Sequence, residues 1–253
     1  MPKLNLALQL YTVRDMAETD LPGTLQKVAR IGYAGVELAG FGNLKTARDV
    51  KKAVDDVGLK ICGAHDGIDE LEKDLPKCLA KHTELGNRNI CVPWLSDDRR
   101  KGAAGWKATA QSLSRIGKQV RAAGFEFAYH NHSFEFEKFD GVSGFDILWS
   151  TSDPDALKAE LDVYWLQHGG VDPVSYINKL GKRTMLLHLK DMAAGPEQKF
   201  APVGTGILDF KAILEAGSKS GVTWGIVEQD NCYGMPTIES AKISFQNLQA
   251  LNA

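Results

Sequence analysis

Residues 125–136 read Phe-Glu-Phe-Ala-Tyr-His-Asn-His-Ser-Phe-Glu-Phe, and the interpretation of the whole chain starts from this stretch. It follows Gly124, opens with aromatic and small apolar residues, and turns polar at its C-terminal end, which is typical of a buried strand. Because side chains alternate across a strand, we expect His130 and His132 to point to the same side. Two imidazoles at the mouth of a strand suit a divalent metal or a polar ligand. The simpler alternative is a hydrogen-bonded histidine pair in a loop.

The alternation of an apolar strand with an amphipathic helix continues on both sides of this stretch. Strands are predicted over 5–11, 35–38, 59–64, 89–92, 157–163, 184–189 and 224–227, and the fifth strand is the stretch 125–136 itself, which begins as a strand. Helices are predicted over 21–31, 45–57, 71–85, 106–123, 145–150, 172–180, 210–220 and 237–251, with a Gly- and Pro-containing loop over 191–206.

Strict alternation on this scale predicts parallel strands joined by right-handed crossovers. The fold class is therefore expected to be α/β, with residues 1–253 forming a single (β/α)8 TIM barrel domain. A doubly wound open sheet is the alternative. It is disfavoured because no Gly-rich dinucleotide turn follows the first strand.

Composition limits the function. The chain has 253 residues, 43% of them hydrophobic, and a net charge of −2, so nothing favours a nucleic-acid or membrane partner. Its four cysteines have no metal-ligand spacing, and the N-terminus lacks the apolar core of a signal peptide, which favours a cytoplasmic protein with reduced thiols. His82 and His168 are expected on the surface without a role. Assembly into a homo-oligomer stays open.

Polar residues mark the C-terminal ends of most predicted strands. Ionisable groups at the end of an apolar strand are costly unless they are paired or coordinated, and in a barrel these ends share the face that carries the active site. The set comprises Glu37, His65, Trp94, His130, His132, Asp162, His188, Lys190 and Glu228. Imidazole and carboxylate donors at His130, Asp162, His188 and Glu228 predict a site for Mn²⁺, Mg²⁺, Co²⁺ or Zn²⁺. A metal-free hydrogen-bonded network is the alternative.

Several of these residues have a structural reading beside the functional one. Gln9 ends the first strand and is a candidate substrate contact. Glu37 is either a substrate contact or a buried acid paired with Arg14. His65 either contacts substrate or caps a turn with Asp66.

Aromatic and basic residues carry the same ambiguity. Trp94 and Trp165 are either packing residues or the aromatic walls that flank a sugar ring. Lys190 shares a strand face with His188, but a surface ion pair with Asp191 is the alternative.

Six runs occur in order over nearly the whole chain: GYAGVELAG, AYHNHSFEF, ELDVYW, LLHLKDM, VGTGILDF and VEQD. Together they resemble the sugar phosphate isomerase/epimerase family with the xylose isomerase-like barrel, in its Tyr-His-Asn-His sub-branch. The resemblance implies a divalent metal, most often Mn²⁺, held by a Glu, an Asp, a His and a Glu after strands five to eight. Asp162, His188 and Glu228 match the last three. His130 replaces the first Glu, which leaves the ligand set one negative charge short.

The resemblance implies a sugar isomerase or epimerase that removes the proton α to a carbonyl of a small-molecule sugar. Glu228 is the expected base, and His132, Lys190 and Glu135 are candidates for the partner acid, Glu135 also as a substrate contact. Loss of a carboxylate at position 130 also favours a lyase or dehydratase acting on a keto-sugar, keto-glycoside or inosose. A non-catalytic sugar-binding barrel is the third alternative.

Overall fold

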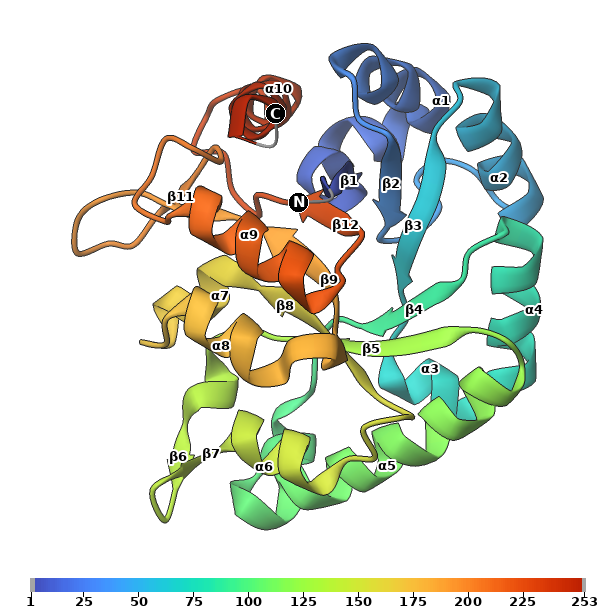
Figure 1. Cartoon of the computed structure of the whole chain (residues 1–253). Coiled ribbons are helices and arrows are strands. Elements are labelled where there is room, and N and C mark those ends of the chain that lie inside the picture. The colour runs from blue at the N-terminus through green and yellow to red at the C-terminus, as the bar shows by residue number, and fades with distance from the viewer. Residues whose placement is uncertain (1–2, 252–253) are drawn as a thin grey trace.

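Residues 3–251 are described by a computed structural model, in which eight parallel strands close into a barrel (Figure 1). The barrel strands are β1 (Asn5–Gln9), β2 (Gly35–Leu38), β3 (Lys60–His65), β4 (Asn89–Val92), β5 (Glu126–His130), β8 (Lys158–Asp162), β9 (Thr184–Leu189) and β12 (Trp224–Val227). Closure comes from β1, which pairs with β2 on one side and with β12 on the other. The predicted TIM barrel is therefore confirmed.

Helices surround the barrel because each presents an apolar stripe to it and a polar face to solvent. They are α1 (Arg14–Ile31), α2 (Ala47–Asp56), α3 (Ile68–Lys73), α4 (Leu75–Leu85), α5 (Gly102–Ala122), α6 (Gly144–Thr151), α7 (Val163–His168), α8 (Pro173–Leu180), α9 (Phe210–Ser220) and α10 (Thr237–Leu251). Asp172 caps α8 as expected, because its Oδ1 accepts the N–H of Ser175 at 2.7 Å.

The structure differs from the predicted boundaries in several places, and helix α1 begins at Arg14 rather than at residue 21. Strand β1 ends at Gln9, where a 3₁₀ turn begins. The helix predicted over 71–85 is two helices, since Asp74 leaves helical geometry and caps α4 with its side chain. Helix α7 directly follows β8 and was not predicted. The predicted loop over 191–206 contains a small hairpin, β10 (Asp191–Met192) with β11 (Phe200–Ala201). A second small hairpin joins β6 (Lys138–Phe139) to β7 (Val142–Ser143).

The barrel interior is layered. A base of small or branched apolar side chains is formed by Ala7, Cys62, Cys91, Ala128, Leu186 and Ile226. Because alternate residues of each strand point inward, the next inward positions toward the C-terminal ends are two residues further on. On four of these strands that position is polar, with Gln9, His130, His188 and Glu228, and the buried Glu37 of β2 lies at the same end. The fold therefore gathers its polar groups at one end of the barrel.

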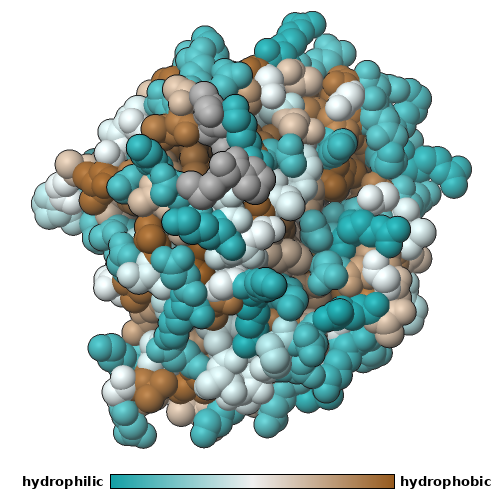
Figure 2. Space-filling model, in the orientation of Figure 1, coloured by the Kyte–Doolittle hydropathy of each residue, from teal (hydrophilic) through white to brown (hydrophobic). Residues whose placement is uncertain are grey.

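The surface is mainly hydrophilic on the face shown in Figure 2, where apolar residues are scattered among polar ones. Within residues 3–251, none of the helices combines the length and apolar character that a bilayer crossing requires. The expectation for His82 is wrong: its side chain is fully buried, and Nε2 lies 2.8 Å from Oδ2 of Asp66. The carboxylate of Asp66 therefore pairs with His82, and it does not form the predicted turn cap with His65.

Candidate metal centre

Four predicted side chains converge at the C-terminal end of the barrel. His130, Asp162, His188 and Glu228 come from β5, β8, β9 and β12, which are neighbours in the barrel. Each offers one donor atom, and these four atoms lie within 4.8 Å of one another. The imidazole Nδ1 of His188 is 2.9 Å from Glu228 Oε2, and Nε2 of His130 is 3.7 Å from Asp162 Oδ2. Two nitrogen and two oxygen donors thus face a common centre, as the ligands of a metal ion do.

One oxygen of the Asp162 carboxylate caps a helix, and the other faces the donor set and Lys190. Its Oδ1 caps α7 by accepting the N–H of Trp165 at 2.9 Å, and its own N–H donates to Asn131 Oδ1 at 3.0 Å. Its Oδ2 is buried and accepts no hydrogen bond from the described residues. Burial raises the pKa of Asp162 to about 6, although Lys190 opposes the shift. The same Oδ2 lies 3.2 Å from the ammonium of Lys190, so it already faces a positive charge and is directed at the place where a cation would bind.

Lys190 lies between three carboxylates. Its Nζ is 2.8 Å from Glu228, 2.9 Å from Asp230 and 3.2 Å from Asp162, and the side chain is 2% exposed. Burial alone would lower the pKa of Lys190. The three carboxylates have the larger effect and hold this pKa well above its usual value. The alternative of a surface ion pair with Asp191 is wrong, because Asp191 is fully buried and accepts backbone N–H groups instead.

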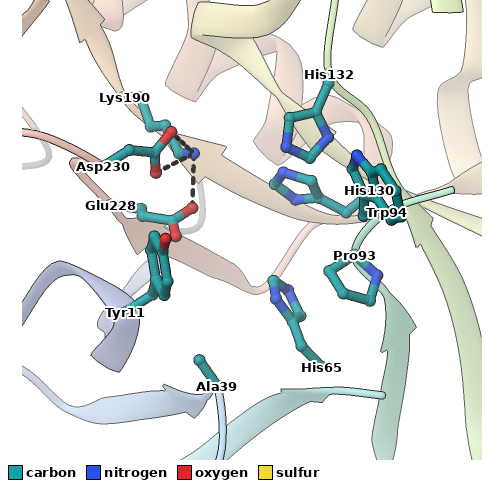
Figure 3. A pocket seen from close by; sticks show the side chains of 10 residues that line it. All are labelled: Tyr11, Ala39, His65, Pro93, Trp94, His130, His132, Lys190, Glu228 and Asp230. Carbon is teal, nitrogen blue, oxygen red and sulfur yellow. Dashed lines mark hydrogen bonds and ion pairs between the residues drawn. The ribbon is translucent and has the colours of Figure 1, made fainter. Parts of the chain in front are cut away.

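A cavity of about 450 Å³ opens above these groups. Figure 3 shows Lys190 and Glu228 on one side of it and His132 on the other. The lining residues are Tyr11, Ala39, His65, Pro93, Trp94, His130, His132, Lys190, Glu228 and Asp230. The space accommodates a small polar molecule in contact with the convergent donors.

His132 faces this cavity as a neutral imidazole. Burial, reinforced by Lys190, lowers its pKa to about 3. The ring stacks on Phe134 with centroids 5.4 Å apart, and it packs on Trp165 at 5.3 Å. Its Nδ1 is buried and has no hydrogen-bond partner in the described part of the chain. His132 and His130 do share one side of the strand, with ring centroids 5.2 Å apart.

A second polar cluster lies directly beneath the four donors. Glu37 Oε2 is 2.6 Å from His188 Nε2 and 3.2 Å from His65 Nε2, and it accepts from Gln9 at 2.8 Å. Glu160 Oε2 is 2.9 Å from His65 Nε2. Burial opposes protonation, yet these two carboxylates raise the pKa of His65 to about 10. Glu37 therefore pairs with imidazoles and not with Arg14.

Four predicted substrate contacts do not line the cavity. Gln9 and Glu37 are fully buried below it. Glu135 is also fully buried and accepts from the Tyr129 hydroxyl at 2.6 Å. Trp165 packs behind His132, with its indole N–H buried and unpartnered among the described residues.

Trp94 and His65 do line the cavity, and the Trp94 side chain is 51% exposed at its mouth. An exposed, half-accessible indole at the entrance fits the predicted aromatic wall better than a packing residue.

The sequence prediction missed Glu160 and Asp230. Each lies two residues from a predicted ligand, Glu160 before Asp162 and Asp230 after Glu228. Strand alternation alone turns residues spaced by two to the same side. The same spacing predicted His132 beside His130 and Lys190 beside His188, but it was not extended to Glu160 or Asp230.

The charges of the site favour a cation. Five buried or partly buried carboxylates lie in the two clusters: Asp162, Glu228 and Asp230 contact Lys190, Glu37 contacts His188, and Glu160 contacts His65. Protonated His65 offsets part of this charge, and His188 does so until an ion displaces its proton, yet grouped buried carboxylates are stable only with further compensation. Mixed imidazole and carboxylate donors suit a borderline-hard divalent ion.

Comparison with known proteins finds relatives over most of the chain. The chain is 30% identical over 155 residues to an inosose dehydratase of Lacticaseibacillus casei, a match that covers 54% of this chain but only about half (49%) of that enzyme's length. It is 25% identical to an inosose dehydratase of Clostridium beijerinckii over 94% of this chain and 89% of the relative. A sugar phosphate isomerase/epimerase structure from Parabacteroides distasonis superposes with a TM-score of 0.86 at 26% identity, covering 99% of this chain and 95% of that one. Residues 25–251 match the xylose isomerase-like TIM barrel family, and the chain therefore belongs to it.

Proposed function

We propose that this protein is a metal-dependent lyase that removes water from a ketone-bearing sugar or cyclic polyol. The observation that carries the proposal is the pairing of a neutral, unpartnered imidazole with a buried ammonium across one cavity, at His132 and Lys190. Elimination needs a base for the proton α to the ketone and an acid for the departing β-hydroxyl. The inosose dehydratases among the relatives support the same reaction class.

The proposed steps conserve atoms and charge. His132 takes the proton from the carbon next to the ketone, and the electron pair of that C–H bond moves toward the carbonyl. The pair then forms a carbon–carbon double bond as the β C–O bond breaks. Lys190 donates a proton to the leaving oxygen, so that water departs. A divalent ion at the four donors would polarise the carbonyl and make the α proton more acidic.

Glu228 is less suited to the role of base than the sequence suggested. Its Oε2 already contacts Lys190 at 2.8 Å and His188 at 2.9 Å. Burial alone would raise the pKa of Glu228, but Lys190 and His188 outweigh burial and hold this pKa well below its usual range. Glu228 therefore serves as a ligand and a charge partner with its Oε2 already engaged, whereas the Nδ1 of His132 has no hydrogen-bond partner among the described residues.

Isomerisation or epimerisation is the second candidate, because it starts with the same proton removal. The observation that favours it is the position of Glu228 across the cavity from His132, where two groups face a substrate from opposite sides (Figure 3). The similarity to a sugar phosphate isomerase/epimerase structure also supports it.

One experiment separates these outcomes. The Mn²⁺-loaded protein is incubated with an inosose and with keto-sugars in D₂O, and products are followed by NMR. The proposal expects loss of water and a new double bond. Deuterium uptake with the carbon skeleton and all hydroxyls intact would establish isomerase chemistry instead. If the protein binds the sugar without converting it, and chelation does not change the binding, the protein is a non-catalytic sugar-binding barrel.

A further inference from the structure

Each imidazole of the candidate metal centre uses its two nitrogens differently. In His130, Nε2 faces Asp162 and Nδ1 lies 3.2 Å from Glu160 Oε2. In His188, Nδ1 faces Glu228 and Nε2 lies 2.6 Å from Glu37 Oε2. Both rings therefore point one nitrogen into the donor set and the other at a fully buried carboxylate below it.

We propose that Glu160 and Glu37 are positioning residues that fix the tautomer of His130 and His188 and strengthen them as metal ligands. The inference deepens the proposed metal-dependent function and rests on it. A carboxylate that accepts the far N–H of an imidazole places the lone pair on the near nitrogen and increases its electron density. Glu160 thereby supplies, one hydrogen bond away, the negative charge that His130 does not bring as a ligand.

Glu160 is placed for this role and not for direct ligation beside Asp162. The two residues are separated by one position on β8 and both point inward, so their Cα atoms differ in height by about 6.6 Å along the strand. The carboxylate of Glu160 is already occupied below the donors: Oε1 accepts from Cys91 Sγ at 3.3 Å, and Oε2 contacts His65 at 2.9 Å. Its position is therefore fixed before any ion arrives.

Glu37 is held in the same way. Its Oε2 accepts from the Gln9 amide at 2.8 Å and contacts His65 at 3.2 Å, so that one oxygen anchors three neighbours. Strand pairing reinforces this, since Gln9 and Glu37 lie opposite each other in the β1–β2 ladder. His65 links Glu37 to Glu160 and makes the two supports one unit.

The first test measures the dissociation constant for Mn²⁺ directly, by calorimetry, in the variants Glu160→Gln and Glu37→Gln. Each neutral isostere is expected to weaken binding about 10- to 100-fold, the usual effect of removing such a partner. Asp66→Asn is the matched control, because Asp66 is a buried carboxylate bonded to an imidazole, that of His82, outside the site. The control is expected to lose stability and keep the wild-type affinity.

A second test separates support of His130 from a general structural role. In a His130→Glu background the ligand carries its own charge, so adding Glu160→Gln is expected to leave Mn²⁺ affinity unchanged or to improve it. Equal losses in the wild-type and His130→Glu backgrounds would overturn the proposal. So would anomalous density that places Mn²⁺ between His65 and Glu160.

The outcomes also distinguish this inference from the proposed function. Wild-type protein that dehydrates its substrate with Mn²⁺, together with unchanged affinity in Glu160→Gln and Glu37→Gln, would refute the positioning role alone. Wild-type protein that binds no Mn²⁺ would refute both.

Discussion

His132 is the residue on which the proposed chemistry most depends, because it lines the cavity as a neutral imidazole. Replacing it with asparagine is expected to lower kcat about 10²- to 10⁴-fold, the usual contribution of a general base. Mn²⁺ affinity should not change, since His132 is outside the four-donor set. Steady-state kinetics and calorimetry check both expectations.

His168→Asn is a suitable control, because that histidine lies at the end of α7 and outside the cavity lining. An unchanged kcat in His132→Asn, or a loss confined to metal affinity, would assign the base to another group.

The buried carboxyl group of Glu135 is expected to make folding stability depend on pH. Burial raises its pKa to about 7 from an ordinary value of 4.5, against the opposing hydrogen bond from Tyr129. Between these two pH values the folded protein keeps a proton that the unfolded chain has lost. The stabilisation is therefore complete below about pH 4.5 and is lost as pH rises through 7. The loss is on the order of 3 kcal/mol.

Urea unfolding at about pH 5 and pH 8 tests this, in wild type and in Glu135→Gln. The glutamine cannot ionise, so the stability of the variant relative to wild type should rise with pH. A constant difference at both pH values would mean that Glu135 titrates normally in the folded protein.

Individual residues show where sequence reasoning succeeds and where it stops. The four predicted donors do converge, because each lies at a strand end and barrel closure brings strand ends together. The partners of Glu37 were not predictable, since the contact with His188 spans 151 residues. The buried state of Lys190 also depends on carboxylates from two other strands.

At the scale of elements, Asp191 organises the segment that follows β9. Its Oδ1 accepts from Met192 at 2.7 Å and Leu208 at 3.2 Å, and its Oδ2 accepts from Gly204 at 3.0 Å and Gly206 at 2.8 Å. Gly206 is required there, because a Cβ would lie 2.4 Å from Asp191 Oδ1. This arrangement favours a fixed loop over a mobile lid for residues 203–208.

Asp191→Ala is expected to leave these backbone N–H groups without an acceptor, at a cost of about 1–3 kcal/mol for each that stays buried. Hydrogen exchange should accelerate at Gly204 and Gly206, and proteolysis should cut within 193–206. Asp191→Asn keeps one acceptor oxygen, so its exchange and proteolysis rates should lie between those of Asp191→Ala and wild type. Unchanged exchange in Asp191→Ala would show that the hairpin alone holds the segment.

The element boundaries that sequence missed have local physical causes. A continuous helical pattern runs through 71–85, but Asp74 ends one helix and caps the next. Its side chain bonds to a backbone N–H, which competes with continuing the helix. Helix α7 is too short to give a periodic signal, and its formation depends on the Asp162 cap.

At the scale of the whole molecule, a bound ion should stabilise the fold. An ion at a concentration 100 times its dissociation constant contributes about 2.7 kcal/mol. For a chain of this size that corresponds to a rise in Tm of about 5–10 °C. Chelation should reverse the rise, and Asp162→Asn should abolish the response.

Thermal unfolding with EDTA and with added Mn²⁺, Mg²⁺, Co²⁺ or Zn²⁺ measures this effect and ranks the ions. A Tm that is the same with EDTA and with every ion would contradict the metal centre. The barrel itself would stand, because its prediction came from strand and helix alternation and does not involve an ion.

Barrel closure also bears on how the protein is made. The first strand pairs with the last, Asn5 opposite Trp224, so this contact has one of the largest sequence separations in the chain. During synthesis the early strands leave the ribosome long before Glu228 is available to them. The ion-binding constellation therefore cannot assemble on a nascent or prematurely terminated polypeptide, and the capacity to bind the ion reports that translation has reached the final βα unit.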